Sequence, residues 1–141
     1  MIQMAPYLYF TGACESALTF YARCGLGEVR EMRRYADTPI VSRLGEDWRD
    51  KVLHSRFEGP GLRFFASDGA DSEPMKGCAL LIEMQNPDEA AATFERLSDG
   101  GRITVPFVRQ FWGDHYGNFT DRFGVQWAIS CASGPGAVRG A

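Results

Sequence analysis

The sequence predicts an α+β fold built from two βαβββ modules that follow one another along the chain. Three observations indicate this architecture: short apolar runs typical of strands surround two helical patterns, the element order of the first half recurs in the second, and a short segment of sequence recurs with it. Of the 141 residues, 45% are hydrophobic and 23% are charged, so the chain can bury a core of its own.

The first module is expected at residues 4–67. An aromatic run at residues 4–10 is typical of a strand, and the Thr11-Gly12 pair after it indicates a turn. Apolar residues then recur at spacings of three and four over residues 14–24, which predicts an amphipathic helix that the following glycines end. Three more strands are predicted, at residues 28–35, 51–58 and 62–67.

Two segments are expected outside the strands and helices. Residues 36–50 form the one sizeable loop within a module, and loops of about 12 residues or more are often functional. An excursion that carries Trp48 back to the core is an equal alternative. Residues 133–141 are expected to be a flexible tail.

The second module is expected at residues 77–131, after a polar connector rich in turn residues. An apolar strand at residues 78–84 precedes a helix at residues 87–97, for which Asn86 and Pro87 supply the cap and the first turn. Three further strands are predicted, at residues 102–108, 116–120 and 125–131.

The two modules share a short stretch of sequence as well as their element order. The run "ALTFY" at residues 17–21 recurs as "AATFE" at residues 91–95, and Gly27 recurs as Gly101 at the same spacing. We therefore expect a single duplicated domain over residues 1–132.

The composition argues against two classes of partner. The formal net charge is -3, so no overall positive field attracts nucleic acid or an anionic membrane. No apolar run approaches the ~20 residues that a membrane-spanning helix needs. We expect neither a nucleic-acid partner nor a membrane partner.

The cysteines indicate a reducing compartment. They show no C-x-x-C spacing, and the start of the chain does not resemble a secretory signal, so a cytoplasmic location is expected. We expect all of them to act as small buried hydrophobic residues. They are Cys14, Cys24, Cys78 and Cys131.

Four stretches, together with the element order, carry a family resemblance: "PYLYFTGACESALTFY", "KVLHSRF", "FFASDG" and "FWGDHYGNFTDRFGVQW". In them the chain resembles the vicinal oxygen chelate superfamily (glyoxalase I, bleomycin-resistance proteins and ring-cleaving dioxygenases), and within it the PhnB-like branch. The resemblance implies that the two modules form a curved, partly open β-sheet cleft with the helices on the outer face. It also implies a ligand on the concave side and a homodimer.

The superfamily usually holds a divalent ion with His and Glu side chains on the first and last strands of each module. Carried over to this sequence, those positions fall at Ala5 or Pro6, near Phe65, at Cys78 or Ala79, and at Ala128. Of these only Cys78 can coordinate a metal, and His54 and His115 are the only histidines. We therefore expect no metal site and no other cofactor.

The third strand supplies the one candidate catalytic residue. Alternation places His54 and Arg56 on one face, which is the concave face if Leu53 and Phe57 pack on a helix. His54 could then act as an acid or base near neutral pH, with Arg56 beside it in a ligand pocket. A hydrogen-bonded histidine in a half-buried strand is an equal alternative.

Four more residues are candidates for the pocket. Arg63 and Phe65 share one face of the next strand, where they would add a cation and an apolar wall; an exposed strand arginine is the plainer alternative. Trp112 precedes the seventh strand, where its ring would cap the pocket or merely pack the hairpin. Gln126 points to the concave side if Trp127 packs on a helix.

The remaining polar candidates have structural interpretations. His115 is expected in a turn, facing solvent, and Asp68 and Asp121 are expected to bind backbone amides in turns.

Two functions fit these expectations. The first is a metal-free protein that binds a small apolar or anionic molecule in the concave cleft. The second is a lyase or isomerase that uses His54 as an acid or base, or a metal at a divergent site. A structural role without a ligand is a third alternative.

Overall fold

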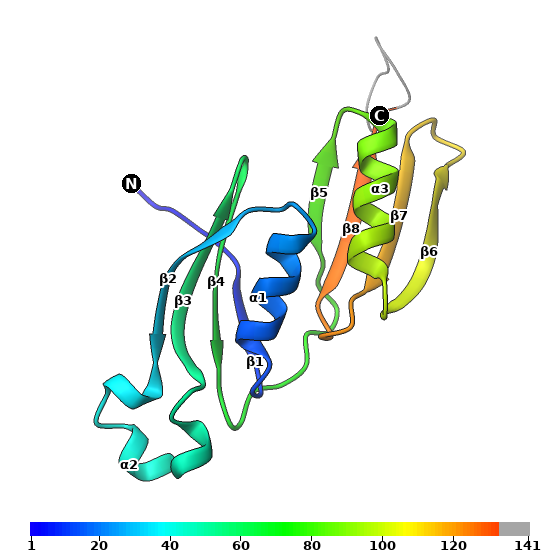
Figure 1. Ribbon diagram of the computed structural model, residues 1–141. Coiled ribbons are helices and arrows are strands. Elements are labelled where there is room, and N and C mark those ends of the chain that lie inside the picture. Colours follow the sequence, from blue (N-terminus) through cyan, green and yellow to red (C-terminus); the bar gives the residue numbers. More distant parts are fainter. Residues whose placement is uncertain (133–141) are drawn as a thin grey trace. The chain divides into compact units, whose positions relative to one another are not determined.

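The computed structural model describes residues 1–132 and has the α+β fold predicted from the sequence. It contains two βαβββ modules, each with one open four-stranded sheet (Figure 1). The chain divides into two compact units, Met1–Pro74 and Met75–Ala141, which hold one module each. The predicted tail at residues 133–141 lies outside the described residues. Within residues 1–132, no helix has the length and apolar character needed to cross a membrane.

The first unit pairs its first strand with its last. Its elements are β1 (Tyr7–Phe10), α1 (Cys14–Arg23), β2 (Glu28–Arg34), β3 (Val52–Gly59) and β4 (Leu62–Asp68). The strand order is β1-β4-β3-β2, in which β1 runs parallel to β4 and the other neighbours are antiparallel. α1 packs on one face of this sheet.

The loop between β2 and β3 is structured. It contains the short helices η1 (Tyr35–Asp37), α2 (Val41–Leu44) and η2 (Glu46–Trp48). The Trp48 ring meets the buried Tyr35 ring edge-on, with 5.6 Å between the ring centroids. This contact agrees with the alternative in which the loop carries Trp48 back to the core.

The core of the first unit is aromatic. Tyr21 of α1 is fully buried, and its ring meets Phe57 and Phe64 edge-on at 6.5 Å and 6.1 Å between centroids. Edge-to-face pairs of this kind contribute about 0.5–1.5 kcal/mol beyond their buried area. Because Phe57 and Phe64 lie on the strand faces toward α1, their neighbours in sequence are turned to the other side of the sheet.

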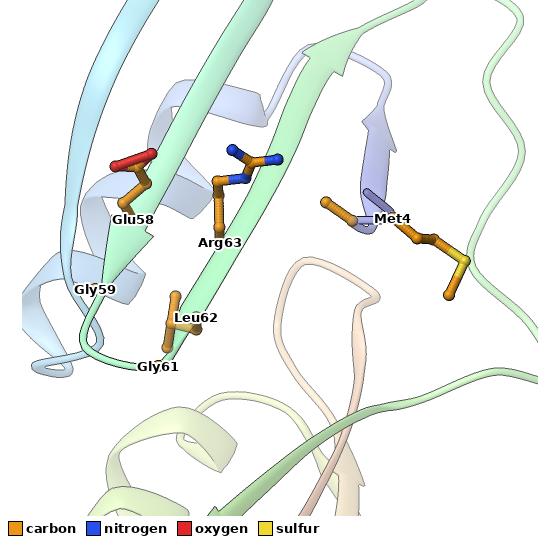
Figure 2. A pocket seen from close by; sticks show the side chains of 7 residues that line it. Met4, Glu58, Gly59, Gly61, Leu62 and Arg63 are labelled. Atoms are coloured by element: carbon orange, nitrogen blue, oxygen red, sulfur yellow. The ribbon is translucent and has the colours of Figure 1, made fainter. Parts of the chain in front are cut away.

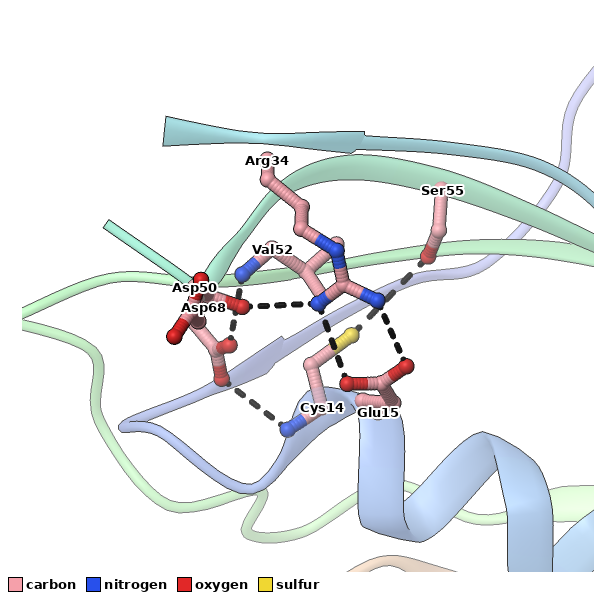
Figure 3. A network of polar contacts seen from close by, with 7 residues as sticks. All are labelled: Cys14, Glu15, Arg34, Asp50, Val52, Ser55 and Asp68. Carbon is pink, nitrogen blue, oxygen red and sulfur yellow. Dashed lines mark hydrogen bonds and ion pairs between the residues drawn. The ribbon is translucent and has the colours of Figure 1, made fainter. Parts of the chain in front are cut away.

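A buried carboxylate at the end of β4 connects three segments of the first unit (Figure 3). Asp68 is only 2% exposed. Its Oδ1 accepts the N–H groups of Gly12 and Cys14 at 2.8 Å and 3.0 Å, and its Oδ2 accepts the N–H of Val52 at 3.0 Å. Asp68 therefore holds the start of α1 and the start of β3 against the end of β4, which confirms its predicted bonding to backbone amides.

Cys14 lies inside this network as an inert thiol. Its Sγ is 3.8 Å from the Ser55 hydroxyl, which itself donates a hydrogen bond to the Ala66 carbonyl at 2.7 Å. Burial, and after it the charge of Asp68, raises the pKa of the Cys14 thiol to about 12. The thiol stays protonated near neutral pH, so Cys14 is a packing residue and not a nucleophile.

An exposed ion pair joins α1 to β2 at the edge of the same region (Figure 3). The Arg34 guanidinium donates two hydrogen bonds to the Glu15 carboxylate, at 3.0 Å and 2.7 Å, and one to the Asp50 carbonyl at 2.8 Å. The pair holds the pKa of Glu15 below its usual value. Because both side chains face solvent, its contribution to stability is small.

The second unit repeats the arrangement. Its elements are β5 (Leu80–Met84), α3 (Pro87–Ser98), β6 (Arg102–Arg109), β7 (His115–Thr120) and β8 (Gln126–Cys131). The strand order is β5-β8-β7-β6, with β5 parallel to β8. As predicted, α3 begins after Asn86, whose side chain accepts the Glu89 N–H at 3.0 Å. Asp121 also binds amides as predicted, through the N–H groups of Phe123 and Val125.

The first strand of each module begins later than predicted. β1 starts at Tyr7 because Pro6 has no N–H to continue the ladder, although its carbonyl still accepts the Phe65 N–H at 3.0 Å. β5 starts at Leu80 because the Cys78 N–H bonds the side chain of Gln126 at 3.3 Å instead of a neighbouring strand.

Two glycines show the duplication most directly. A Cβ added at Gly27 would lie 2.2 Å from the Glu58 carbonyl oxygen, and one added at Gly101 would lie 2.2 Å from the Thr120 carbonyl oxygen. Glu58 and Thr120 lie at the ends of β3 and β7, which are equivalent strands. The same close approach therefore requires glycine at the same point of both modules.

The matching letters of the two helices, by contrast, are not structurally equivalent. Tyr21 is buried, but the residue it matches in "AATFE", Glu95, is exposed. Phe94, the residue before it, is buried and meets Phe119 edge-on at 5.0 Å. The buried stripes of the two helices align two residues away from the letter match, in an alignment that pairs Cys14, Ala17, Leu18 and Tyr21 with Ala90, Thr93, Phe94 and Leu97. The repeat is therefore established by topology and by the glycines.

We expect Asp68→Asn to lower the free energy of unfolding by about 1–3 kcal/mol, because the amide offers one acceptor oxygen where the carboxylate offers two and leaves a buried N–H unpaired. Urea unfolding followed by circular dichroism measures the change. Asp71→Asn, the same substitution at an exposed residue of the following loop, is the control and should change stability by less than about 0.5 kcal/mol. Equal stability of the two variants would contradict this role for Asp68.

Candidate functional site

The sheet of the first unit has a free face, on the side away from α1. Four predicted pocket residues lie there: His54, Arg56, Arg63 and Phe65. Phe57 packs against Tyr21 of α1, as the prediction for this face requires, whereas Leu53 is only half-buried. The alternation argument thus places the four side chains on a common surface.

The strand register adds Tyr7 to this surface. Tyr7 pairs with Phe65 across β1 and β4, and Arg56 pairs with Phe65 across β3 and β4. The Tyr7 hydroxyl and His54 Nδ1 form a hydrogen bond of 3.2 Å. Tyr7 was not among the predicted site residues, although alternation in "PYLYF" puts Tyr7 and Tyr9 on one face of the strand.

Four rings lie next to one another on this surface, which we call the aromatic face: Tyr7, Tyr9, His54 and Phe65. The Phe65 ring centroid is 5.6 Å from that of His54 and 6.1 Å from that of Tyr7, with interplanar angles of 24° and 21°. Tyr7 is 38% exposed and Tyr9 is 62% exposed. The aromatic face therefore offers solvent a set of nearly parallel rings.

Arg56 is balanced by carboxylates of its own sheet. Its Nη1 lies 3.6 Å from Glu31 and its Nε lies 3.2 Å from Glu58. The Nε–H direction does not meet a hydrogen-bond acceptor, so the contact with Glu58 is an ion pair without a hydrogen bond. The positive charge of Arg56 is thus largely neutralised by the carboxylates of Glu31 and Glu58.

Arg63 has a different environment. Its guanidinium lies over the Phe65 ring, 5.3 Å from the centroid, a cation–π distance. Arg63 also lines a hollow of about 520 Å³ at the start of β4, together with Glu58, Leu62 and Met4 (Figure 2). An exposed cation thus lies between a hollow and an aromatic wall.

The second unit has a smaller hollow on its own sheet, of about 290 Å³. The predicted pocket residue Gln126 lines it, as do Tyr116 and Asn118, and all its lining side chains are uncharged. Trp112 is 46% exposed, and its ring centroid lies 5.9 Å from that of Tyr116. The structure thus places Gln126 and Trp112 in one region of the second unit, and the other four predicted residues in the first unit.

The side chains at the positions that the resemblance assigns to a metal do not fit a divalent ion. Phe65 presents only a ring, and Ala128 presents a buried methyl group between Leu81 and Asn118 of the adjacent strands. Nowhere in residues 1–132 do three or more His, Cys, Asp or Glu side chains gather in a way that could hold a metal. We therefore derive no chemical step through a metal.

Two predictions made for single residues are wrong. His115 does not face solvent from a turn: it begins β7, is half-buried, and lies 5.9 Å from the Phe107 ring, because it pairs with Arg109 in the ladder between β6 and β7. Cys78 is exposed, because it precedes β5 and is not covered by the core. The other three cysteines are buried, as predicted: Cys14, Cys24 and Cys131.

The difference in exposure predicts that one thiol per chain reacts rapidly with a thiol reagent such as 5,5′-dithiobis(2-nitrobenzoate) in native buffer. All four cysteines should react once urea unfolds the chain, which calibrates the measurement. The Cys78→Ser variant should lose the rapid phase and keep the slow one. A rapid phase that survives in Cys78→Ser would show that another cysteine is accessible.

Comparison with known proteins agrees with this fold. The model of the Glyoxalase/Bleomycin resistance protein/Dioxygenase superfamily matches residues 3–129. The protein YjdN of Escherichia coli (strain K12) is 26% identical over 137 residues, which cover 90% of this chain and 93% of YjdN. The crystal structure of protein PA1353 from Pseudomonas aeruginosa is 34% identical, has a TM-score of 0.82, and covers 94% of this chain and 98% of its own.

More distant structures share the fold alone. The PhnB protein from Bacillus cereus is 22% identical with a TM-score of 0.78, covering 93% of this chain and all of its own (100%). The fosfomycin resistance protein FosX from Listeria monocytogenes is 13% identical with a TM-score of 0.63, covering 94% of this chain and 95% of its own. With the family model matched along nearly the whole chain and both βαβββ modules present, this chain belongs to the Glyoxalase/Bleomycin resistance protein/Dioxygenase superfamily.

Proposed function

We propose that this chain binds a small apolar or anionic molecule on the aromatic face of its first module, without the metal that is usual in the superfamily. One observation carries the proposal: nearly parallel rings lie exposed on a sheet face, with His54 and Arg63 beside them. Binding sites typically combine an apolar wall with a few directed polar groups.

The imidazole of His54 on this face can form one more hydrogen bond. Tyr7 occupies Nδ1 of His54, and no second hydrogen bond to the imidazole is found in the described residues. The Nε2 atom of His54 is therefore available to a ligand. The ring centroids of Tyr7, His54 and Phe65 lie 5.6–6.1 Å from one another, so two neighbouring rings restrict the orientation in which the imidazole meets a ligand.

The relatives support binding of small molecules in general. The superfamily description includes bleomycin resistance proteins, and FosX is a fosfomycin resistance protein. Both names refer to resistance to a small molecule. The chemical class that we propose for the ligand of this chain is argued from its own aromatic face.

A second candidate is a lyase or isomerase in which His54 acts as an acid or base. The hydrogen bond between Tyr7 and His54 favours it, because a hydroxyl at Nδ1 orients the imidazole and leaves Nε2 for proton transfer.

A thermal-shift screen of metabolite-like compounds tests the first candidate, because a ligand of the native state must raise the apparent stability. We expect stabilising compounds whose effect is reduced in Phe65→Leu and His54→Ala. It should be unchanged in Phe111→Leu, the same substitution as Phe65→Leu at an exposed residue between β6 and β7.

The same samples separate the two candidates. Mass spectrometry of compounds incubated with the protein should show no turnover if the chain only binds, and turnover lost in His54→Ala if it is an enzyme. Elemental analysis that finds about one metal ion per purified chain would contradict the metal-free proposal. Binding that is equal in all three variants would place the ligand away from the aromatic face.

We also propose that residues 1–132 act as one domain of a cytoplasmic homodimer. Each sheet is open and has two edge strands within its unit, and unpaired edges favour association. Apolar side chains on one of these edges, Ile103 and Val108 of β6, are half exposed, at 50% and 52%. Sedimentation velocity at micromolar concentration should give the mass of a dimer, and a monomer there would contradict this proposal.

A further inference from the structure

We propose that the aromatic face selects planar aromatic monocarboxylates, with Arg63 binding the carboxylate while the ligand ring stacks along Phe65 and His54. This inference rests on the proposed function, since it names the class of molecule that the same face would bind. It assigns Arg63 a role in specificity that Arg56, on the same face, cannot share.

The first step concerns charge. Arg63 forms no ion pair within residues 1–132, and its cross-strand neighbour is Glu58. The Glu58 carboxylate is engaged elsewhere: it lies 3.2 Å from Arg56 and 4.0 Å from Arg30. Arg56 in turn is also held by Glu31, at 3.6 Å. Arg33, which lies opposite His54 on β2, is 3.4 Å from Glu31. Among these arginines Arg63 is the one without a carboxylate partner in residues 1–132, so an incoming anion can use its charge.

The second step concerns direction. The guanidinium of Arg63 lies 5.3 Å over the Phe65 ring, so it is held above the apolar wall instead of extending freely into water. Guanidinium presents its N–H donors in a planar fork that matches the two oxygens of a carboxylate. A carboxylate bound there would be joined to a part of the ligand that lies over Phe65.

The third step concerns the shape of the ligand. The rings of Phe65, His54 and Tyr7 deviate from parallel by only 21° to 39°. A flat ring can extend such a stack of nearly parallel rings, whereas a saturated ring of the same size touches it at fewer points. The hollow beside Arg63 is open to solvent and is lined by none of these rings, so the ligand ring would lie on the sheet face itself.

The fourth step limits the charge of the ligand to one. Glu58 lines the same hollow as Arg63 (Figure 2), and its side chain is 33% exposed. A dianion such as a phosphonate would bring two negative charges to one free guanidinium and a neighbouring carboxylate. A monocarboxylate avoids this repulsion.

Isothermal titration of the full chain with matched probes tests the inference. The probes are 2-naphthoate, neutral 2-naphthamide, saturated decalin-2-carboxylate and 2-naphthylphosphonate. We expect 2-naphthoate to bind about 10- to 100-fold more tightly than 2-naphthamide, as for a lost charged hydrogen bond. The saturated and phosphonate probes should also bind more weakly than 2-naphthoate.

Variants assign the effect to Arg63. Arg63→Gln should weaken 2-naphthoate about 10- to 100-fold and leave 2-naphthamide within about twofold, and Arg63→Lys should fall between, because lysine lacks the planar fork. Arg23→Gln removes the same charge from the last turn of α1 and should leave 2-naphthoate within about twofold. The melting temperature of each variant shows that it is folded.

Several results would overturn the inference. They are equal binding of 2-naphthoate and 2-naphthamide, an unchanged affinity in Arg63→Gln, an equal loss in Arg23→Gln, and equal or tighter binding of the saturated or phosphonate probe. Failure of every probe to bind at millimolar concentration would overturn it as well. In that last case the proposed function still stands if the compound screen yields a ligand that depends on Phe65 and His54, and falls if it does not.

Discussion

The aromatic face depends on the parallel pairing of β1 with β4. In this register Tyr7 lies beside Phe65, and a slip of one residue would turn Leu8 outward and the tyrosine toward α1. The buried Asp68 carboxylate closes the end of this pair, because it holds the turn after β1 and the start of β3 to β4. The positions of the rings are therefore set by buried hydrogen bonds, and the weaker contacts between the rings only follow from that register.

The fold could be predicted from the sequence because its signals are redundant. Each module contains a helix with an apolar stripe, strands with alternating faces, and a glycine where the chain passes close to a strand end, at Gly27 and Gly101. The letter match between the helices was a poorer guide, because it pairs the buried Tyr21 with the exposed Glu95, while the buried stripes of the two helices align two residues away from it. Burial depends on the angle of a residue around the helix, and a two-residue shift changes that angle by about 200°.

The site could be predicted only in part. Alternation was sufficient to place His54, Arg63 and Phe65 on one sheet face, since the other face of their strands is buried and mostly apolar. Tyr7 was missed because its role comes from pairing with a strand far away in the sequence. His115 was misplaced because its sequence neighbours resemble a turn, while the ladder to Arg109 pulls it into a strand. Pairing between strands, whether distant as for Tyr7 or across a hairpin as for His115, leaves no mark in a local pattern.

The two modules share a framework but differ in what their sheets present. The first module offers rings and the guanidinium of Arg63, which forms no ion pair within residues 1–132, and the second offers a hollow lined by uncharged side chains such as Tyr116, Asn118 and Gln126. The framework consists of the buried core residues and of glycines such as Gly27 and Gly101, which lie close to neighbouring backbone. Each module needs side chains of similar size at these positions. The exposed sheet faces carry no such constraint. A duplicated fold can therefore supply one surface that recognises charge and another that recognises hydrogen-bonding groups, without any change in how the chain folds.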